Sequence, residues 1–353
     1  MLTPFCAPRR PGAATRRRRA IGTLCNALTG RTALVACSAL ASFALALSPV
    51  QAEPLLQRFR GATISAPDLA KVEQDYARYL GYFVRERGKV SAALAASWDA
   101  PRAAGRPYIL MSADTHPDVY IRAVRVPAVR DYRALTTHGW GSVEIVVDDT
   151  DATFARFKGS PFRVIGKPAN LKGYPSIRAF QVEGRSGEVL YLTSETGDRS
   201  RSPLPAPGGP VGRIFIMVMG GPDINAMVDW YTTGFGLSSG PIRTTPIGVV
   251  QRAQGLGAGV ETPITTMRLA QQGNLFELDG YSATATVRPR AVGDLPPGVA
   301  ITSVSVRSLD AVPDAVKVSF ITPPAAHGGL AYGGRRGATA RGAAGELLEI
   351  VEE

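Results

Sequence analysis

The chain has 353 residues, of which 45% are hydrophobic and 20% charged, and its mean hydropathy is +0.02. This composition excludes a disordered chain, while 38 glycines and 27 prolines indicate a turn-rich, mixed or β-rich fold. The formal net charge of +11 would favour nucleic-acid binding only if it belonged to the folded part. However, residues 1–52 hold seven of the 40 Lys and Arg residues and no acidic residue, which leaves 33 basic against 29 acidic side chains. We therefore expect no nucleic-acid partner.

The first 52 residues have the pattern of a signal peptide. Arginines precede an apolar run over 32–48, and small residues lead to Ala52. We expect export by the general or the twin-arginine route, with an uncleaved anchor as the alternative. The cysteines all lie in this leader, so the mature protein would hold no disulfide or thiolate site. The expected location is periplasmic or secreted, with no membrane association after cleavage.

Four copies of one β-α-β-β-β unit follow the leader. The first opens with an alternating strand over 61–66, the helix-capping Asp68 and "DYARYLGY" at 75–82, which aligns with "WYTTGFGL" at 230–237 in the third. The second opens at "GSVEIVVDDTD" from 141 and the fourth at "ITSVSVRSLD" from 301. Units two, three and four close on the similar strands "GEVLYL" (187–192), "GNLFEL" (273–278) and "GELLEI" (345–350).

The units are expected to pair, because a lone unit leaves one sheet face uncovered. The stretch 199–210 is rich in Pro, Gly and Ser and is typical of a linker. We expect units one and two to form one domain over 53–198, and units three and four a second domain over 211–353. The chain would then be a dimer-like arrangement of domains within one polypeptide.

This pattern resembles the vicinal-oxygen-chelate superfamily, which includes glyoxalase I, extradiol dioxygenases and bleomycin-resistance proteins. The resemblance rests on "DYARYLGY", "WYTTGFGL", "GNLFE" and "GELLE", and it covers nearly all of 58–353. It implies an α+β fold in which paired βαβββ units form two curved sheets, each around a cleft. Catalytic members hold a divalent metal there, with His or Gln on the first strand of a unit and Glu on its last strand.

The chain departs from that ligand pattern. If the first-strand ligand lies about seven residues before the helix cap, its places are taken by Gly61, Gly141, Gly212 and Ile301. The last-strand places are taken by Arg122, Tyr191, Glu277 and Glu349. The first domain would then lack ligands, and the second would have two carboxylates that suit a hard cation.

Two kinds of site remain open. Glu277 and Glu349, with His327, are candidate ligands of a divalent metal in the second domain, against the alternative of carboxylates left over from an ancestral site. Candidate contacts of a small organic ligand are aromatic or cationic, and each has an ordinary structural role as its alternative: Tyr191, Arg122, Trp140 and Arg335.

We expect an exported protein that binds a small organic molecule without the usual His/Glu metal site. The first alternative is a metal-dependent lyase or dioxygenase that uses the second domain, with the metal as Lewis acid. The second alternative is an interaction module with vestigial clefts. No residue is identified as catalytic, and the sequence does not decide whether the protein is an enzyme.

Overall fold

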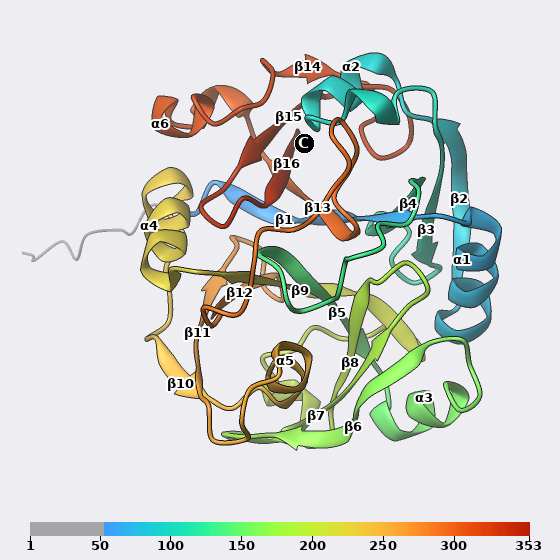
Figure 1. The fold of residues 1–353 in the computed structure, drawn as a ribbon, viewed down its shortest axis with the longest axis vertical. Coiled ribbons are helices and arrows are strands. Elements are labelled where there is room, and N and C mark those ends of the chain that lie inside the picture. The colour runs from blue at the N-terminus through green and yellow to red at the C-terminus, as the bar shows by residue number, and fades with distance from the viewer. Residues whose placement is uncertain (1–52) are drawn as a thin grey trace, which may run out of the picture. The chain divides into compact units, whose positions relative to one another are not determined.

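The computed structural model describes residues 53–353, so the expected signal peptide over 1–52 lies outside the described residues. These residues form two eight-stranded sheets with few helices, built from four βαβββ units. Figure 1 shows how these elements are arranged. The expected α+β fold with paired units in two curved sheets is confirmed. Within the described residues, no helix is long and apolar enough to span a bilayer.

The first sheet contains units one and four in the strand order β14-β15-β16-β13-β1-β4-β3-β2. Unit one comprises β1 (Leu56–Ala66), α1 (Leu69–Asp75) with a π-helical turn (Tyr76–Leu80), β2 (Tyr82–Lys89), α2 (Ala92–Ser97) with a 3-10 turn (Pro101–Ala103), β3 (Pro107–Ala113) and β4 (Tyr120–Arg125). Unit four comprises β13 (Gly298–Val306), a 3-10 turn (Leu309–Ala311), α6 (Asp314–Lys317), β14 (Ala325–Ala326), β15 (Arg336–Arg341) and β16 (Leu347–Glu352).

The second sheet contains units two and three in the order β10-β11-β12-β9-β5-β8-β7-β6. Unit two comprises β5 (Gly139–Val147), α3 (Thr150–Arg156), β6 (Arg163–Leu171), β7 (Tyr174–Glu183), β8 (Val189–Glu195) and a 3-10 turn (Arg199–Arg201). Unit three comprises β9 (Val211–Gly221), α4 (Ile224–Phe235), β10 (Arg243–Thr245), α5 (Gly248–Gln254), β11 (Thr262–Arg268) and β12 (Leu275–Gly280).

The pairing of units differs from the expectation. Strand β1 pairs antiparallel with β13, and β5 pairs antiparallel with β9, so unit one joins unit four and unit two joins unit three. The stretch 199–210 therefore connects two units of the same sheet and does not separate two domains. The expected domains 53–198 and 211–353 each contribute one unit to each sheet. The composition of the linker identified a connection correctly but could not show which first strands meet.

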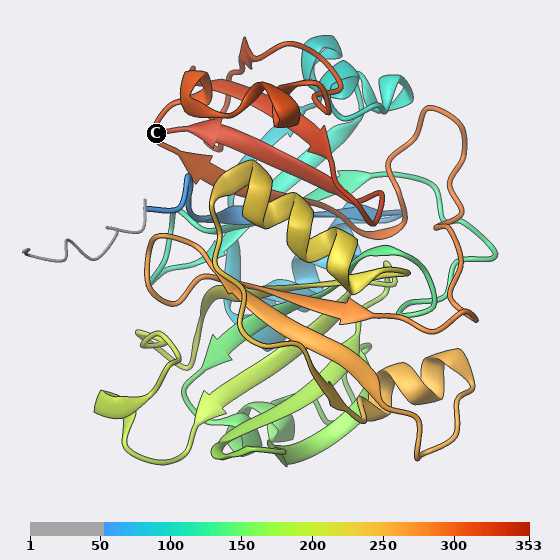
Figure 2. The same cartoon turned by 90° about the vertical axis from the view of Figure 1, so that its left-hand side faces the viewer.

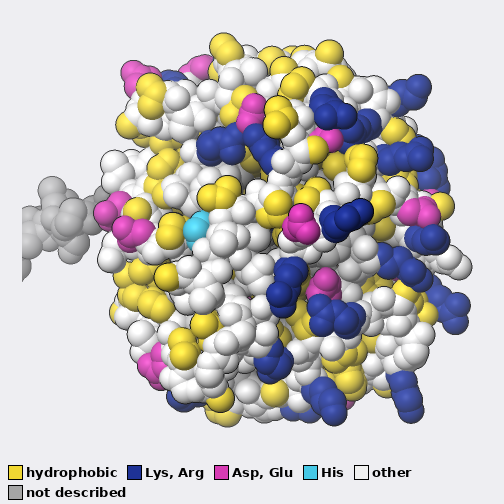
Figure 3. Space-filling model, in the orientation of Figure 1, with side chains coloured by type: hydrophobic (Ala, Val, Ile, Leu, Met, Phe, Trp, Pro, Cys, Tyr) yellow, Lys and Arg dark blue, Asp and Glu magenta, His cyan; other side chains and the backbone are white. Residues whose placement is uncertain are grey.

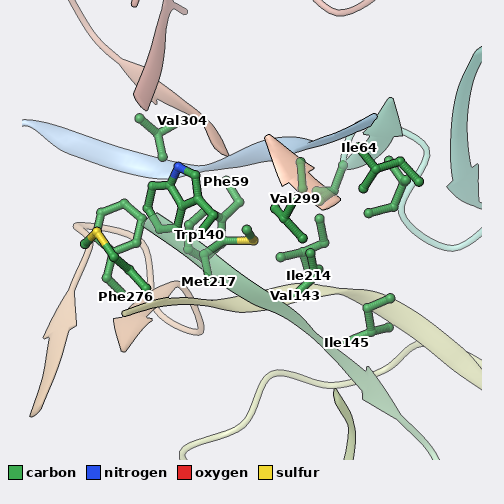
Figure 4. Close-up of a cluster of buried hydrophobic side chains, with 14 of the residues drawn as sticks. Phe59, Ile64, Trp140, Val143, Ile145, Ile214, Met217, Phe276, Val299 and Val304 are labelled. Carbon is green, nitrogen blue, oxygen red and sulfur yellow. The ribbon is translucent and has the colours of Figure 1, made fainter. Parts of the chain in front are cut away.

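A shared hydrophobic core lies between the two sheets. Figure 4 shows side chains from both sheets meeting there, and Figure 2 shows α4 crossing the edge of this layer. Trp140 of β5 packs against Phe276 of β12, and its indole N–H donates to the carbonyl of Leu347 on β16 at 2.8 Å. We call the face of each sheet that is turned away from this core its outer face.

The repeated motifs also connect one sheet to the other. The hydroxyl of Tyr76, in "DYARYLGY", donates to Glu188 of "GEVLYL" at 3.2 Å. Its counterpart Tyr231, in "WYTTGFGL", donates to Glu346 of "GELLEI" at 3.1 Å. In these two motifs, the glutamate directly after the glycine is buried as the acceptor of a tyrosine from the other sheet. The first acidic position of the motif is therefore structural.

Candidate functional site

The helix caps fix four equivalent positions on the outer faces. Each first strand ends two residues before the N-cap of its helix, and the four caps are Asp68, Asp149, Asp223 and Ser308. The four equivalent positions lie five residues before these caps. Counting back gives Thr63, Glu144, Val218 and Ser303. Strand register places each beside the last-strand residue of its own unit, in the pairs Thr63–Arg122, Glu144–Tyr191, Val218–Glu277 and Ser303–Glu349.

This register corrects the first-strand places that the sequence predicted. The assumed spacing of seven residues was too long, so Gly61, Gly141, Gly212 and Ile301 do not face the last-strand residues. In unit two the correction changes the chemistry, because Glu144 stands where Gly141 was expected. Counting the same number of residues back from the helix cap in every unit could have identified Glu144.

On the outer face of the first sheet, Arg122 and Glu349 form a buried ion pair. One guanidinium nitrogen of Arg122 lies 3.0 and 3.2 Å from the two carboxylate oxygens of Glu349. The other nitrogens donate to the hydroxyls of Thr63 at 2.9 Å and Tyr332 at 2.6 Å. The guanidinium also lies 4.5 Å from the ring centroid of Trp98, which stabilises the cation further.

Glu349 accepts three further hydrogen bonds, so its charge is fully compensated. The donors are the indole of Trp98 at 2.8 Å and the hydroxyls of Tyr332 and Ser303, each at 2.5 Å. Burial alone would raise the pKa of Glu349, but Arg122 and these donors outweigh it and hold the pKa below its usual value. Glu349 is therefore an anion with no free coordination position.

Aromatic side chains close this face. Trp98, directly after α2, and Tyr332, from the loop 327–335, cover the ion pair, and the cavity left beside it is about 10 Å³. That volume admits about one water molecule. His327 is buried with its ring centroid 5.1 Å from that of Tyr332, while Arg335 is exposed and donates to the Tyr332 carbonyl at 3.4 Å.

The outer face of the second sheet has a different set of residues. Glu144 and Glu277 occupy two of its four positions, Asp279 follows two residues later on β12, and Tyr191 lies beside Glu144. Glu144 accepts one hydrogen bond, from Thr193 at 3.3 Å, and one carboxylate oxygen of Asp279 is buried without a partner. Among residues 53–353, none of the three carboxyl groups is in an ion pair.

These three carboxyl groups favour protonation. Burial raises the pKa of Glu277 to about 7, and it raises the pKa values of Glu144 and Asp279 well above their ordinary values. Repulsion from Glu277 adds to the shift of both. Glu277 and Tyr191 nevertheless remain half-buried at their surface, so a small molecule can reach them.

A cavity of about 380 Å³ opens on the same side of the second sheet. Its apolar wall is built by Leu135, Ile165 and Val249, which belong to the same cluster of packed residues as Tyr191 and Tyr281. Leu135 has a left-handed φ of 63°, a strained conformation for leucine. The rim carries Arg133, Arg163, Arg252 and Glu183, and Figure 3 shows basic side chains down the right-hand half of the view, including the region of α5 and β6.

The predicted site residues are therefore divided between two faces. Arg122, His327, Arg335 and Glu349 belong to the first sheet, whereas Tyr191 and Glu277 belong to the second. Trp140, expected near a cleft, is 1% exposed in the core because its strand turns this side chain toward the other sheet.

The expected metal-ligand set does not assemble. Glu277 and Glu349 lie on different sheets and cannot share one ion, and on the first sheet the cation Arg122 already occupies a ligand place. On the second sheet, Glu144 and Glu277 are accompanied by Val218 and Tyr191 and no imidazole. Within residues 53–353, no three His, Asp or Glu side chains are placed to hold a metal ion. The residues present do not fit the His/Glu set that the resemblance implies.

Comparison with known proteins identifies the fold. No protein-family model matches the sequence, and no curated protein matches it. Among solved structures, glyoxalase I from Zea mays is 14% identical with a TM-score of 0.57, covering 84% of this chain and 92% of that one. A Bacillus subtilis protein proposed to be a dioxygenase is 12% identical with a TM-score of 0.58, covering 85% and 86%. The chain therefore has the vicinal-oxygen-chelate fold, as its four repeated units predicted.

Proposed function

We propose that the protein binds a small organic molecule on the outer face of the second sheet, without the His/Glu metal set of the superfamily. The observation that carries this proposal is the contrast between the two outer faces. The first is filled by Arg122, Glu349 and their aromatic cover, which leave about 10 Å³. The second keeps a cavity of about 380 Å³, within the range of small-molecule sites.

The residues of the second face support binding of an organic molecule. Val249 and Ile165 supply apolar contact area, and Tyr191 supplies an aromatic ring with a hydroxyl. Glu144 and Glu277 add polar groups whose protonation state can adapt to a ligand. Such a mixture of apolar wall and few convergent polar groups is typical of ligand pockets.

Ligand-dependent thermal stabilisation tests this proposal. A library of small aromatic and heteroaromatic compounds should include members that raise the Tm of the mature protein. Ala253 lines the cavity on α5, and Ala253→Trp should abolish those shifts because the indole fills the space. Ala155→Trp, at an exposed position on α3, is the matched control and should retain them. If no compound stabilises the wild type, or if Ala253→Trp responds like the wild type, the proposal is wrong.

We also propose that the protein is exported and that cleavage follows Ala52. The basic, apolar and small-residue segments of 1–52 support this proposal. Cell fractionation followed by N-terminal sequencing provides the test. A mature chain that starts at Glu53 in the exported fraction is the expected result, and full-length chain confined to the cell interior would contradict it.

A further inference from the structure

The two outer faces are internal counterparts of each other. Comparing the two strand orders position by position aligns β16 with β12, β13 with β9, β1 with β5 and β4 with β8. Glu349 then corresponds to Glu277, and Arg122 corresponds to Tyr191. The first face thus shows how this chain satisfies a buried glutamate at that position: a guanidinium approaches it beside an aromatic ring.

The second face lacks that cation. Tyr191 replaces the arginine, and a second glutamate, Glu144, replaces Thr63, so the face has gained an acid and lost a base. Buried carboxylates without a cation are unfavourable in a folded protein. The charge pattern is complementary to a positive group from outside the chain.

Buried polar atoms beside these carboxyl groups also lack hydrogen-bond partners within the described residues. The hydroxyl of Tyr281 is buried and has no hydrogen-bond partner within residues 53–353. It interacts electrostatically with Asp279 and Glu277, and also with the cation Arg288, whose guanidinium donates to backbone carbonyls. It lies over β5, where a Cβ at Gly141 would come within 3.1 Å of it. The Ser142 hydroxyl is likewise buried without a partner. Buried polar groups normally have partners, so a ligand that offers N–H donors would complete this face.

We propose that the ligand of the second face carries an ammonium or guanidinium group that binds between Glu277 and Glu144, with its apolar body against Val249 and Ile165. This inference rests on the proposed function and names its ligand class. The cationic group would take the place that Arg122 occupies on the first face. The ring of Tyr191 would supply the aromatic contact that Trp98 supplies there.

The arginines of the cavity rim do not fill this role. Arg163 is paired with Glu183, Arg252 donates to the carbonyl of Ile165, and Arg133 is exposed to solvent. The side chain of Arg163 is 70% exposed, so solvent and salt screen its charge, whereas Glu144 and Asp279 are buried. Because the rim is rich in arginine, an anionic ligand is the competing hypothesis. The experiment therefore includes an anionic probe.

Three isosteric probes test the ligand class by isothermal titration calorimetry at pH 8. Benzamidine is a cation, benzamide is neutral and benzoate is an anion, and all three share one shape. Benzamidine should bind at least about tenfold more tightly than benzamide, or about 1.4 kcal/mol, with benzoate weakest. Equal binding of benzamidine and benzamide, or tighter binding of benzoate, would overturn the cation proposal while leaving small-molecule binding intact. Binding of none of them, when other library compounds stabilise the protein, would also overturn it.

Two variants place the cation. Glu277→Gln keeps the shape and removes the charge, so it should weaken benzamidine at least about tenfold and leave benzamide unchanged. Glu261→Gln, at an exposed glutamate before β11, is the control and should bind like the wild type. Tyr191→Arg supplies the missing guanidinium from the chain itself, so it should raise the Tm and abolish benzamidine binding. Unchanged benzamidine affinity in both Glu277→Gln and Tyr191→Arg would place the cation elsewhere and contradict the assignment.

Discussion

Replacing Arg122 by methionine should destabilise the protein strongly. Arg122 is 4% exposed and donates to Glu349, Tyr332 and Thr63, so its removal leaves a buried carboxylate without its counter-charge. Breaking one partner out of a buried pair costs about 3–5 kcal/mol. Three donors to Glu349 remain, which favours the lower half of that range. Even this loss is a large part of the total stability of an ordinary domain, about 5–15 kcal/mol.

A double-mutant cycle measured by urea unfolding and circular dichroism tests this reasoning. Arg122→Met with Glu349→Gln keeps an acceptor for Trp98 and Tyr332 but removes the unpaired charge, so the double variant should recover at least about 2 kcal/mol. A loss below about 1 kcal/mol in Arg122→Met, or additive effects of the two substitutions, would refute the account.

The same pair makes a prediction about pH. Glu349 has a lowered pKa in the folded state, so its contribution is present above its ordinary value of 4.5 and is lost as the pH falls through the folded pKa. The difference between the wild type and Arg122→Met should therefore shrink as the pH falls below 4.5. A constant difference across this window would mean that charge does not drive the effect.

Three further predictions concern other parts of the molecule. Because burial raises the pKa of Glu277 to about 7, stability should fall as the pH rises from 4.5 to 7, by at most about 3 kcal/mol; Glu277→Gln should flatten this slope in urea titrations at each pH. Trp140→Phe removes the indole donor to a backbone carbonyl of β16 and should cost about 1–3 kcal/mol in the same assay; no loss would exclude this bond as a link between the sheets. Gly61→Ala brings a Cβ to 2.3 Å from the Tyr120 carbonyl and should lower the Tm, whereas Gly257→Ala, with open space around it, should leave the Tm unchanged; equal shifts would contradict the steric reasoning.

The four units and their helix caps could be predicted from the sequence because they depend on local chemistry. Asp68 and Asp223 accept hydrogen bonds from the first-turn amides, and Gly81 and Gly236 end their helices with left-handed φ values of 67° and 68°. Strand alternation and helix capping are visible within a few residues of the chain.

The pairing of units and the composition of each face could not be predicted in this way. Which first strands meet depends on contacts across the whole chain, and nothing within β1 distinguishes β13 from β5 as its partner. Glu144 was missed because the assumed spacing before the helix cap placed the position three residues too early, at Gly141. The sequence makes Glu349 a candidate metal ligand and does not show its ion pair, because its partner Arg122 lies 227 positions away in the chain.

The exchange of units between the sheets also sets an order for biosynthesis. The second sheet is built from one continuous stretch, 139–280, whereas the first sheet combines strands from 56–125 with strands from 298–352. During synthesis from the N-terminus, β1–β4 must therefore wait until the whole second sheet has been made before β13–β16 can join them. Until then, β1 presents an unpaired edge and Arg122 has no carboxylate beside it. The edge of β1 is thus open to aggregation during synthesis, and β16 completes both the sheet and its charge balance.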